Sequence, residues 1–303
     1  AWTRLVDAGL GCPDWPGCYG FAIFPMTEAE IAQANELYPE RKFEIEKAIP
    51  EVVHRYFAAS LGLLAIFLLF ISIKEKKHIL TSSLLLAIII GQGIFGYLTV
   101  SLKLHPLIVT THLFGAMITT SIFLIIFLRS LKLELSFEIL KANRHLIIIG
   151  FVLIIFQIFL GAWTSTNYAA RACLDLPYCQ GELIPNTDFK EAFNLFQTIG
   201  PNYLFGQMSN EARVAIHITH RIGAIVVFLY SLFLIFKLTS KETLPVIGAF
   251  GAILFLQVFL GINNVLSHLP LWNAVAHNIF GVMLFLCMIV IMYLSYRKVD
   301  AVE

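Results

Sequence analysis

Charged residues are scarce in this sequence. Only 14% of its 303 residues are Asp, Glu, Lys or Arg, and 58% are hydrophobic, whereas a soluble domain usually carries about a quarter charged residues. Together with a mean hydropathy of +0.79, this scarcity excludes an ordinary soluble protein and places most of the chain in lipid. The net charge of +1, without a basic patch interleaved with aromatic residues, gives no reason to expect a nucleic-acid partner.

Long apolar runs dominate the rest of the chain. A transmembrane helix needs roughly 20 mostly apolar residues, and the sequence predicts seven such spans, at about 50–73, 79–101, 107–129, 145–164, 213–237, 244–264 and 273–296.

The short connections indicate how the spans are oriented. Lys and Arg gather at one end of the spans, and the positive-inside rule assigns that end to the cytoplasm. These residues are Lys74, Lys76, Lys77, Arg129, Lys132, Lys141, Arg144, Lys237, Lys241, Arg297 and Lys298. Two long loops, about 3–49 and 165–212, then lie outside, where four of the five cysteines could form disulfides.

The chain contains an internal repeat. Ala1-Trp2-Thr3 recurs as Ala162-Trp163-Thr164, and further motifs recur in the same order at nearly constant spacing. The matched positions are Cys12, Asp14, Pro16, Cys18 and Gly20 with Cys173, Asp175, Pro177, Cys179 and Gly181; His54-Arg55 with His220-Arg221; Gln92-x-x-x-Gly96 with Gln257-x-x-x-Gly261; and His112 with His277.

The repeat predicts the domain organisation. Ala162-Trp163-Thr164 follows a predicted helix, whereas its first-half counterpart opens the sequence, so we expect an eighth, N-terminal transmembrane helix. The fold is then an all-α membrane protein of two pseudo-symmetric four-helix bundles in parallel orientation; seven real spans are the alternative. The expected parts are an N-terminal half 1–129 with outer loop 3–49, a cytoplasmic linker 130–144, and a C-terminal half 145–303 with outer loop 165–212.

Four histidines share one depth in this arrangement. His54, His112, His220 and His277 each lie about one to two turns inside the outer end of a different predicted span. A lone buried histidine is often satisfied by a neighbouring helix, but ionisable groups in a membrane are functional candidates. Four at one depth, two per repeat, favour a shared role.

That role suits haem better than zinc. A haem iron has one axial position on each face, so two facing helices that each donate an imidazole suffice, whereas zinc usually takes four ligands or three plus water. Pairing within each repeat gives His54 with His112 and His220 with His277, one haem per bundle. Arg55 and Arg221 follow two of these histidines and either meet haem propionates or snorkel to the interface.

The two halves differ at one position. Glu51-x-x-His54 in the first half becomes His217-x-x-His220 in the second, and residues three apart share a helix face. Glu51 is therefore a candidate acid–base group beside a haem edge, although an acid after Pro50 also suits a helix start. We expect His217 to support a ligand or to lie at the surface, and not to be a third ligand; the sequence leaves open which of His217 and His220 binds iron.

Each outer loop also carries a Cys-x5-Cys pair, Cys12 with Cys18 and Cys173 with Cys179. Five intervening residues can turn back to form a disulfide. The sequence leaves open whether these pairs are structural or whether the first is a redox relay.

Taken in order, these motifs resemble those of the haem A synthase family. The residues that carry the resemblance are Thr3-Arg4-Leu5, Gly9-Leu10-Gly11-Cys12-Pro13-Asp14-Trp15-Pro16-x-Cys18, Glu51-x-x-His54-Arg55 and the three later histidines His112, His220 and His277.

The resemblance implies an enzyme that oxidises the C8 methyl group of haem O to a formyl group, giving haem A for cytochrome c oxidase. It maps the catalytic carboxylate onto Glu51, the substrate haem onto His54 and His112, and a resident haem b onto His220 and His277. It further implies that the protein lies in a bacterial or archaeal cell membrane. The partners that it allows are an unidentified electron donor, haem O synthase, oxidase assembly factors and a second copy of the chain.

Two other functions stay open at this point. A membrane b-type cytochrome that only transfers electrons explains the four histidines but leaves Glu51 without a task. A quinone-linked disulfide oxidoreductase would use the outer cysteines and needs no haem.

Overall fold

The structure is a computed structural model that describes residues 2–131 and 135–297. The expectations stated above for Ala1, Lys132, Lys298 and the middle of the linker concern residues outside these ranges.

Helices make up the regular secondary structure of the described ranges. In chain order they are α1 (Trp2–Leu5), α2 (Glu28–Leu37), α3 (Ile45–Lys74), α4 (Ile79–Ser101), α5 (Pro106–Ser130), α6 (Glu138–Ala142), α7 (Arg144–Thr166), the 3₁₀ helix η1 (Ala169–Arg171), α8 (Phe189–Ala192), α9 (Asn210–Leu238), α10 (Leu244–Leu266) and α11 (Leu271–Tyr296).

Seven of the described helices, α3, α4, α5, α7, α9, α10 and α11, are long and apolar enough to cross a membrane. The predicted all-α membrane class is confirmed, while the eighth helix stays a prediction. Helices α3 and α9 begin earlier than their apolar runs. In α9 the reason is local, because the side chain of Ser209 caps the first turn by accepting from the N–H of Ala212.

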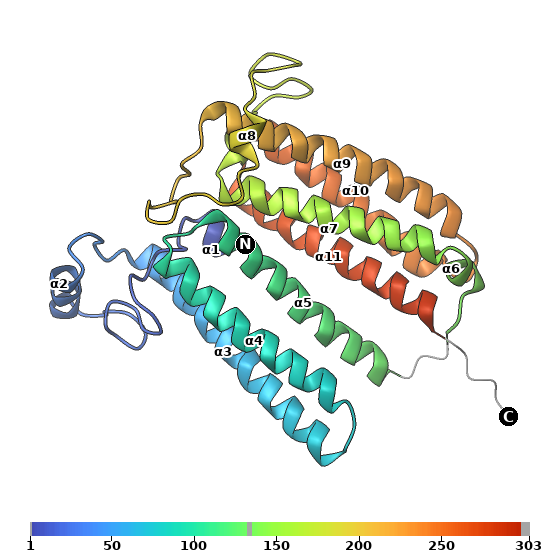
Figure 1. Cartoon of the computed structure of the whole chain (residues 1–303), viewed down its shortest axis with the longest axis horizontal. Helices are drawn as coiled ribbons and strands as arrows, with labels where there is room; N and C mark the ends of the chain where they lie inside the picture. Colours follow the sequence, from blue (N-terminus) through green and yellow to red (C-terminus); the bar gives the residue numbers. More distant parts are fainter. Residues whose placement is uncertain (1, 132–134, 298–303) are drawn as a thin grey trace. The chain divides into compact units, whose positions relative to one another are not determined.

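The chain divides into two compact units. Unit 1 contains residues 1–119 and 195–206, and unit 2 contains residues 120–194 and 207–303. In unit 2, α7 packs on α9 and α11, and α10 packs on α9 and α11, so by their contacts these four helices close into a ring. Figure 1 shows the four helices running side by side. Within that ring α9 and α11 are diagonal partners, which is how a four-helix bundle presents side chains from opposite walls to its core.

Unit 1 is built around the α3–α4 hairpin. The two helices pack along their length (Figure 1), and near the connection Ser72 Oγ and Ser82 Oγ share a hydrogen bond of 2.7 Å. Helix α5 comes close to α4 at Gly115, where an added Cβ would collide with the side-chain amide of Gln92.

The first outer loop packs against α2 and the start of α3. Its core contains Cys12, Cys18 and Tyr19, with Ala34 from α2 and Ala48 from α3. Burial raises the pKa of Tyr19 to about 12, and its hydroxyl donates to the carbonyl of Lys42. The loop is therefore a folded cap with its own core.

Part of the second long loop belongs to unit 1. Residues 195–206 group with that unit, where buried Tyr203 packs with Leu10 and Leu104. The N–H of Tyr203 donates to the carbonyl of Lys103. The boundaries predicted from the repeat placed this segment in the C-terminal half, 145–303. The contacts in the structure group it with unit 1 instead.

Candidate functional site

The first predicted histidine pair is close together in unit 1. His54 on α3 and His112 on α5 have ring centres 6.2 Å apart and planes at 87°. An imidazole nitrogen lies about 1.2 Å from its ring centre and binds a metal at about 2 Å, so two opposed rings that share one metal have centres roughly 6.4 Å apart. His112 is half-buried, and His54 is more exposed. The pair has the spacing that a single shared metal requires.

The second pair lies inside the ring of unit 2. His220 is on α9 and His277 on α11, the diagonal helices, and both side chains are half-buried. The two rings are close enough to interact electrostatically. Two imidazoles from diagonal helices approach a bundle core from opposite sides, which is the arrangement that axial ligation of a flat macrocycle needs.

Several buried polar atoms around these rings suit a bound group. Among the described residues, Nδ1 of His112, Nδ1 of His277 and the Oε1 atoms of three glutamines, Gln92, Gln157 and Gln257, are buried without a hydrogen-bond partner. Buried polar atoms are nearly always paired in a complete site. The residues present therefore fit a haem whose iron takes ring nitrogens of the paired histidines.

Glu51 is buried and holds the first outer loop. Its side chain is 5% exposed, and its oxygens accept from the N–H of Cys12 at 2.9 Å and from the guanidinium of Arg55 at 2.5 Å. A carboxylate can accept about four hydrogen bonds, and with a further one from the backbone of Gly11 three of them are made within the protein. Whether it also serves as an acid or base stays a prediction.

Both arginines bind the backbone of their own loops. Arg55 donates to the carbonyls of Asp14, Pro16 and Gly17. Arg221 donates to the carbonyls of Cys173 and Tyr178, the latter being the position that matches Gly17. The sequence offered propionate contact or snorkelling for these residues, and the structure adds a role in holding the loops. The propionate contact stays a prediction.

The two loops fold alike around a disulfide. Cys12 is bonded to Cys18, and Cys173 to Cys179. Asp14 accepts from the N–H groups of Tyr19 and Gly20, and Asp175 accepts from those of Gln180 and Gly181. Each loop also has a cis peptide bond, before Pro16 and before Pro177. The internal repeat thus extends to the hydrogen bonds of the loops.

A comparison with protein families finds a match along almost the whole chain. The family model COX15-CtaA, described as cytochrome oxidase assembly protein, matches residues 1–289. The chain belongs to this family.

Several curated proteins are similar to this chain over most of their own length. A heme A synthase of Shewanella oneidensis is 40% identical over 98% of this chain and 92% of its own. A heme A synthase of Wolbachia from Brugia malayi is 26% identical over 93% of this chain and 87% of its own. One of Flavobacterium psychrophilum is 27% identical over 91% of this chain and 86% of its own.

Two features of this family member were not visible in the sequence. The Asp14 and Asp175 carboxylates close their loops, a role that an aspartate followed six residues later by a left-handed glycine could have signalled. His217, in the place of Glu51, is 5% exposed, and its Nδ1 has no partner within the part of the chain that the structure describes. It is therefore buried beside His220 and not surface-exposed.

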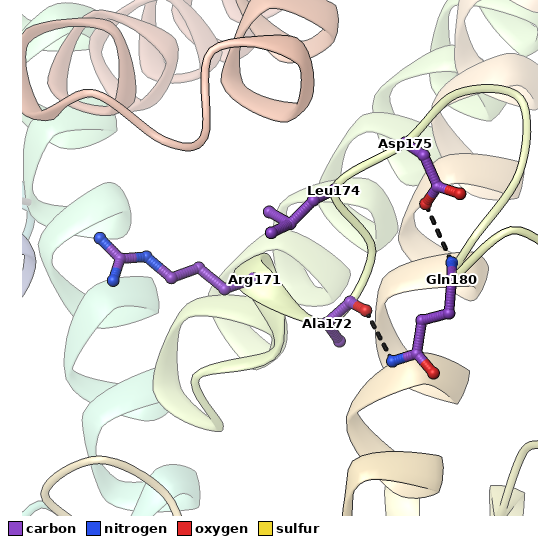
Figure 2. Close-up of a pocket in the computed structure, with 5 residues that line it drawn as sticks. All are labelled: Arg171, Ala172, Leu174, Asp175 and Gln180. Atoms are coloured by element: carbon purple, nitrogen blue, oxygen red, sulfur yellow. Dashed lines mark hydrogen bonds between the residues drawn. The ribbon is translucent and has the colours of Figure 1, made fainter.

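The second loop of this COX15-CtaA protein also carries an open pocket. It is lined by Arg171, Ala172, Leu174, Asp175 and Gln180. Figure 2 shows the Asp175 carboxylate turned to the backbone of Gln180, while Arg171 extends away from both. None of the four paired histidines lines this pocket, so it is separate from the candidate site.

Proposed function

We propose that the chain is a haem A synthase that oxidises the C8 methyl group of haem O to a formyl group, giving haem A for cytochrome c oxidase. The observation that carries the proposal is the His54–His112 pair at 6.2 Å, next to the buried carboxylate of Glu51. The names of the full-length relatives support the same activity.

Haem O is the substrate of unit 1 in this proposal. His54 and His112 would hold its iron, and the outer loop held by Glu51 and Arg55 covers the end of α3 at which His54 lies. The methyl group is hydroxylated twice, first to the alcohol and then to the geminal diol, which loses water to give the formyl group. Each hydroxylation removes two electrons from this carbon, and dioxygen from outside the chain is the terminal oxidant. Glu51 holds or accepts a proton near the reacting substituent.

Haem b is the resident cofactor of unit 2. His220 on α9 and His277 on α11 would hold it, with His217 and Arg221 at the outer end of the same site. When bound, haem b supplies one-electron transfer. Unit 2 contributes a closed ring of four helices that excludes water from this group.

The protein is an integral membrane protein, and the positive-inside rule orients it. We infer that the Lys- and Arg-rich connections face the cytoplasm of a bacterial or archaeal cell, and that the two disulfide-containing loops face outward. Haem O synthase upstream and oxidase assembly factors downstream are the partners that this activity calls for.

The experiment is to purify the full chain, extract its pigments and identify them by mass, then add haem O under aerobic turnover conditions. We expect haem b, together with haem O, haem A or a hydroxylated intermediate. Haem b alone without conversion would indicate an electron-transfer cytochrome, and a colourless protein would favour the disulfide oxidoreductase.

A further inference from the structure

One packing arrangement occurs three times around the candidate sites. A helix with a Gln-x-x-x-Gly motif packs on a helix that carries one of the histidines, so that the glycine faces the imidazole. The three glycine–histidine combinations are Gly96 of α4 with His112, Gly161 of α7 with His220, and Gly261 of α10 with His277.

In each case the glycine meets the same edge of the ring. A Cβ placed on Gly261 would lie 3.1 Å from Cε1 of His277, and one on Gly161 would lie 3.2 Å from Cε1 of His220. Both distances are closer than ordinary van der Waals contact between carbons, at about 3.5–4.0 Å. At Gly96 the corresponding distance to His112 is 3.8 Å, which is an ordinary contact.

The glutamine of the same motif contacts the same ring in unit 2. The amide nitrogen of Gln157 lies 3.0 Å from Nδ1 of His220, and it also donates to the carbonyl of His220. The amide nitrogen of Gln257 lies 3.4 Å from a ring nitrogen of His277. The ring is therefore held at a second point and cannot move freely away from its glycine.

We propose that Gly161 and Gly261 are positioning residues that set the depth and the ring plane of His220 and His277. Their missing side chains let the Cε1 edges reach the backbone of the neighbouring helix, and any side chain there must turn or displace the imidazole. The effect on a bound haem rests on the function proposed above, but the contact between glycine and ring does not.

The test compares Gly161→Ala and Gly261→Ala with Gly248→Ala in the purified full-length protein. Gly248 lies on α10 like Gly261, but no atom lies within 4 Å of its added Cβ, so it controls for the change in helix propensity. The readouts are the midpoint potential of the haem b and its low-spin electron paramagnetic resonance signal, because both report how the axial imidazoles are oriented.

We expect both readouts to shift in Gly161→Ala and Gly261→Ala, and to match the wild type in Gly248→Ala. A variant at Gly96 should disturb His112 least, since its distance is ordinary. If the two alanine variants keep the wild-type potential and signal, the glycines do not position the rings and the proposal is wrong.

A second comparison covers variants that fold poorly or proteins that carry no haem. Thermal unfolding is measured for Gly261→Ala, His277→Ala and the double variant. Removing the ring should relieve the loss of stability caused by the alanine, so the double variant should be more stable than the sum of the single effects predicts. If the losses of thermal stability in the two single variants simply add in the double variant, the proposal is wrong, even in protein that carries no haem. If the losses do not add but the protein is colourless, the positioning role stands and only the proposed haem function is refuted.

Discussion

At the scale of single residues, Glu51 and Arg55 both join α3 to the first outer loop. The carboxylate of Glu51 accepts from the N–H of Cys12, and the guanidinium of Arg55 donates to the carbonyl of Asp14 and to Glu51 itself. Glu51 therefore has a structural task beside the acid–base task proposed for it.

Two substitutions of Glu51 separate its loop contact from its charge. Glu51→Gln keeps an oxygen for the N–H of Cys12 but has no carboxylate, whereas Glu51→Ala removes both. We expect Glu51→Gln to bind both haems and to lower the conversion of haem O by roughly 10²-fold or more, the usual contribution of an acid–base group.

Haem content by absorption and product formation by mass measure these effects. Glu46→Gln, an exposed substitution on the same helix, should leave both unchanged. If Glu51→Gln turns over like the wild type while Glu51→Ala does not, Glu51 serves only to hold the loop.

The sequence located the histidines but not the partners of these charged groups. His54, His112, His220 and His277 could be paired because helical rise and the repeat fix their depth. The contacts of Arg55 and Glu51 could not be read, because they join α3 to loop carbonyls and N–H groups that are about 40 residues away in sequence. Such long-range polar contacts leave no periodic pattern.

At the scale of elements, the long spans were predictable and the polar helices were not. Runs of apolar residues determine where the transmembrane helices lie, within a few residues. The short helices α2 and α8 lie in segments read as loops, because their signals are local caps: Thr27 and Glu30 form a capping box, and Asp188 caps α8. Such caps specify a helix start without an apolar run.

The second disulfide loop should loosen at acid pH. The N–H groups of Gly181 and Gln180 hold the pKa of Asp175 below its ordinary value of 3.8. Because the pKa of Asp175 is lower in the folded loop than in the unfolded chain, its ionised carboxylate stabilises the loop at every pH above 3.8. This stabilisation is lost as the pH falls below 3.8 and passes through the lower pKa of the folded state.

Hydrogen exchange of the Gln180 and Gly181 amides, corrected for intrinsic rates, measures this loss between neutral pH and the acid range. Asp175→Asn cannot ionise, so its loop should be loosened already at neutral pH and should respond little to acid. Amide protection in the wild type that does not change across this range would show that the carboxylate does not stabilise the loop.

At the scale of the whole molecule, the repeat predicted the two kinds of site but not the allocation of every segment. Residues 195–206 have no counterpart among the matched motifs, so their place in unit 1 could not be inferred. Tyr203 explains it physically, because its ring is 2% exposed and stacks edge-on with His105 at 5.2 Å.

Replacing this ring should release the segment. Tyr203→Ala removes a buried aromatic side chain, a change that costs about 3–5 kcal/mol, and we expect residues 195–206 to become susceptible to limited proteolysis. Ile199→Ala changes a side chain that is 74% exposed and should not alter cleavage. Equal cleavage of both variants would mean that Tyr203 does not hold the segment.

The anchoring of residues 195–206 limits how this chain can be divided. If the gene were cut in the linker between the two repeats, the first fragment would lack residues 195–206. The second fragment would carry this segment, but Tyr203 would have lost its contacts with Leu10 and Leu104. When the two fragments are expressed together, the second would therefore have to supply residues 195–206 to the first before unit 1 was complete.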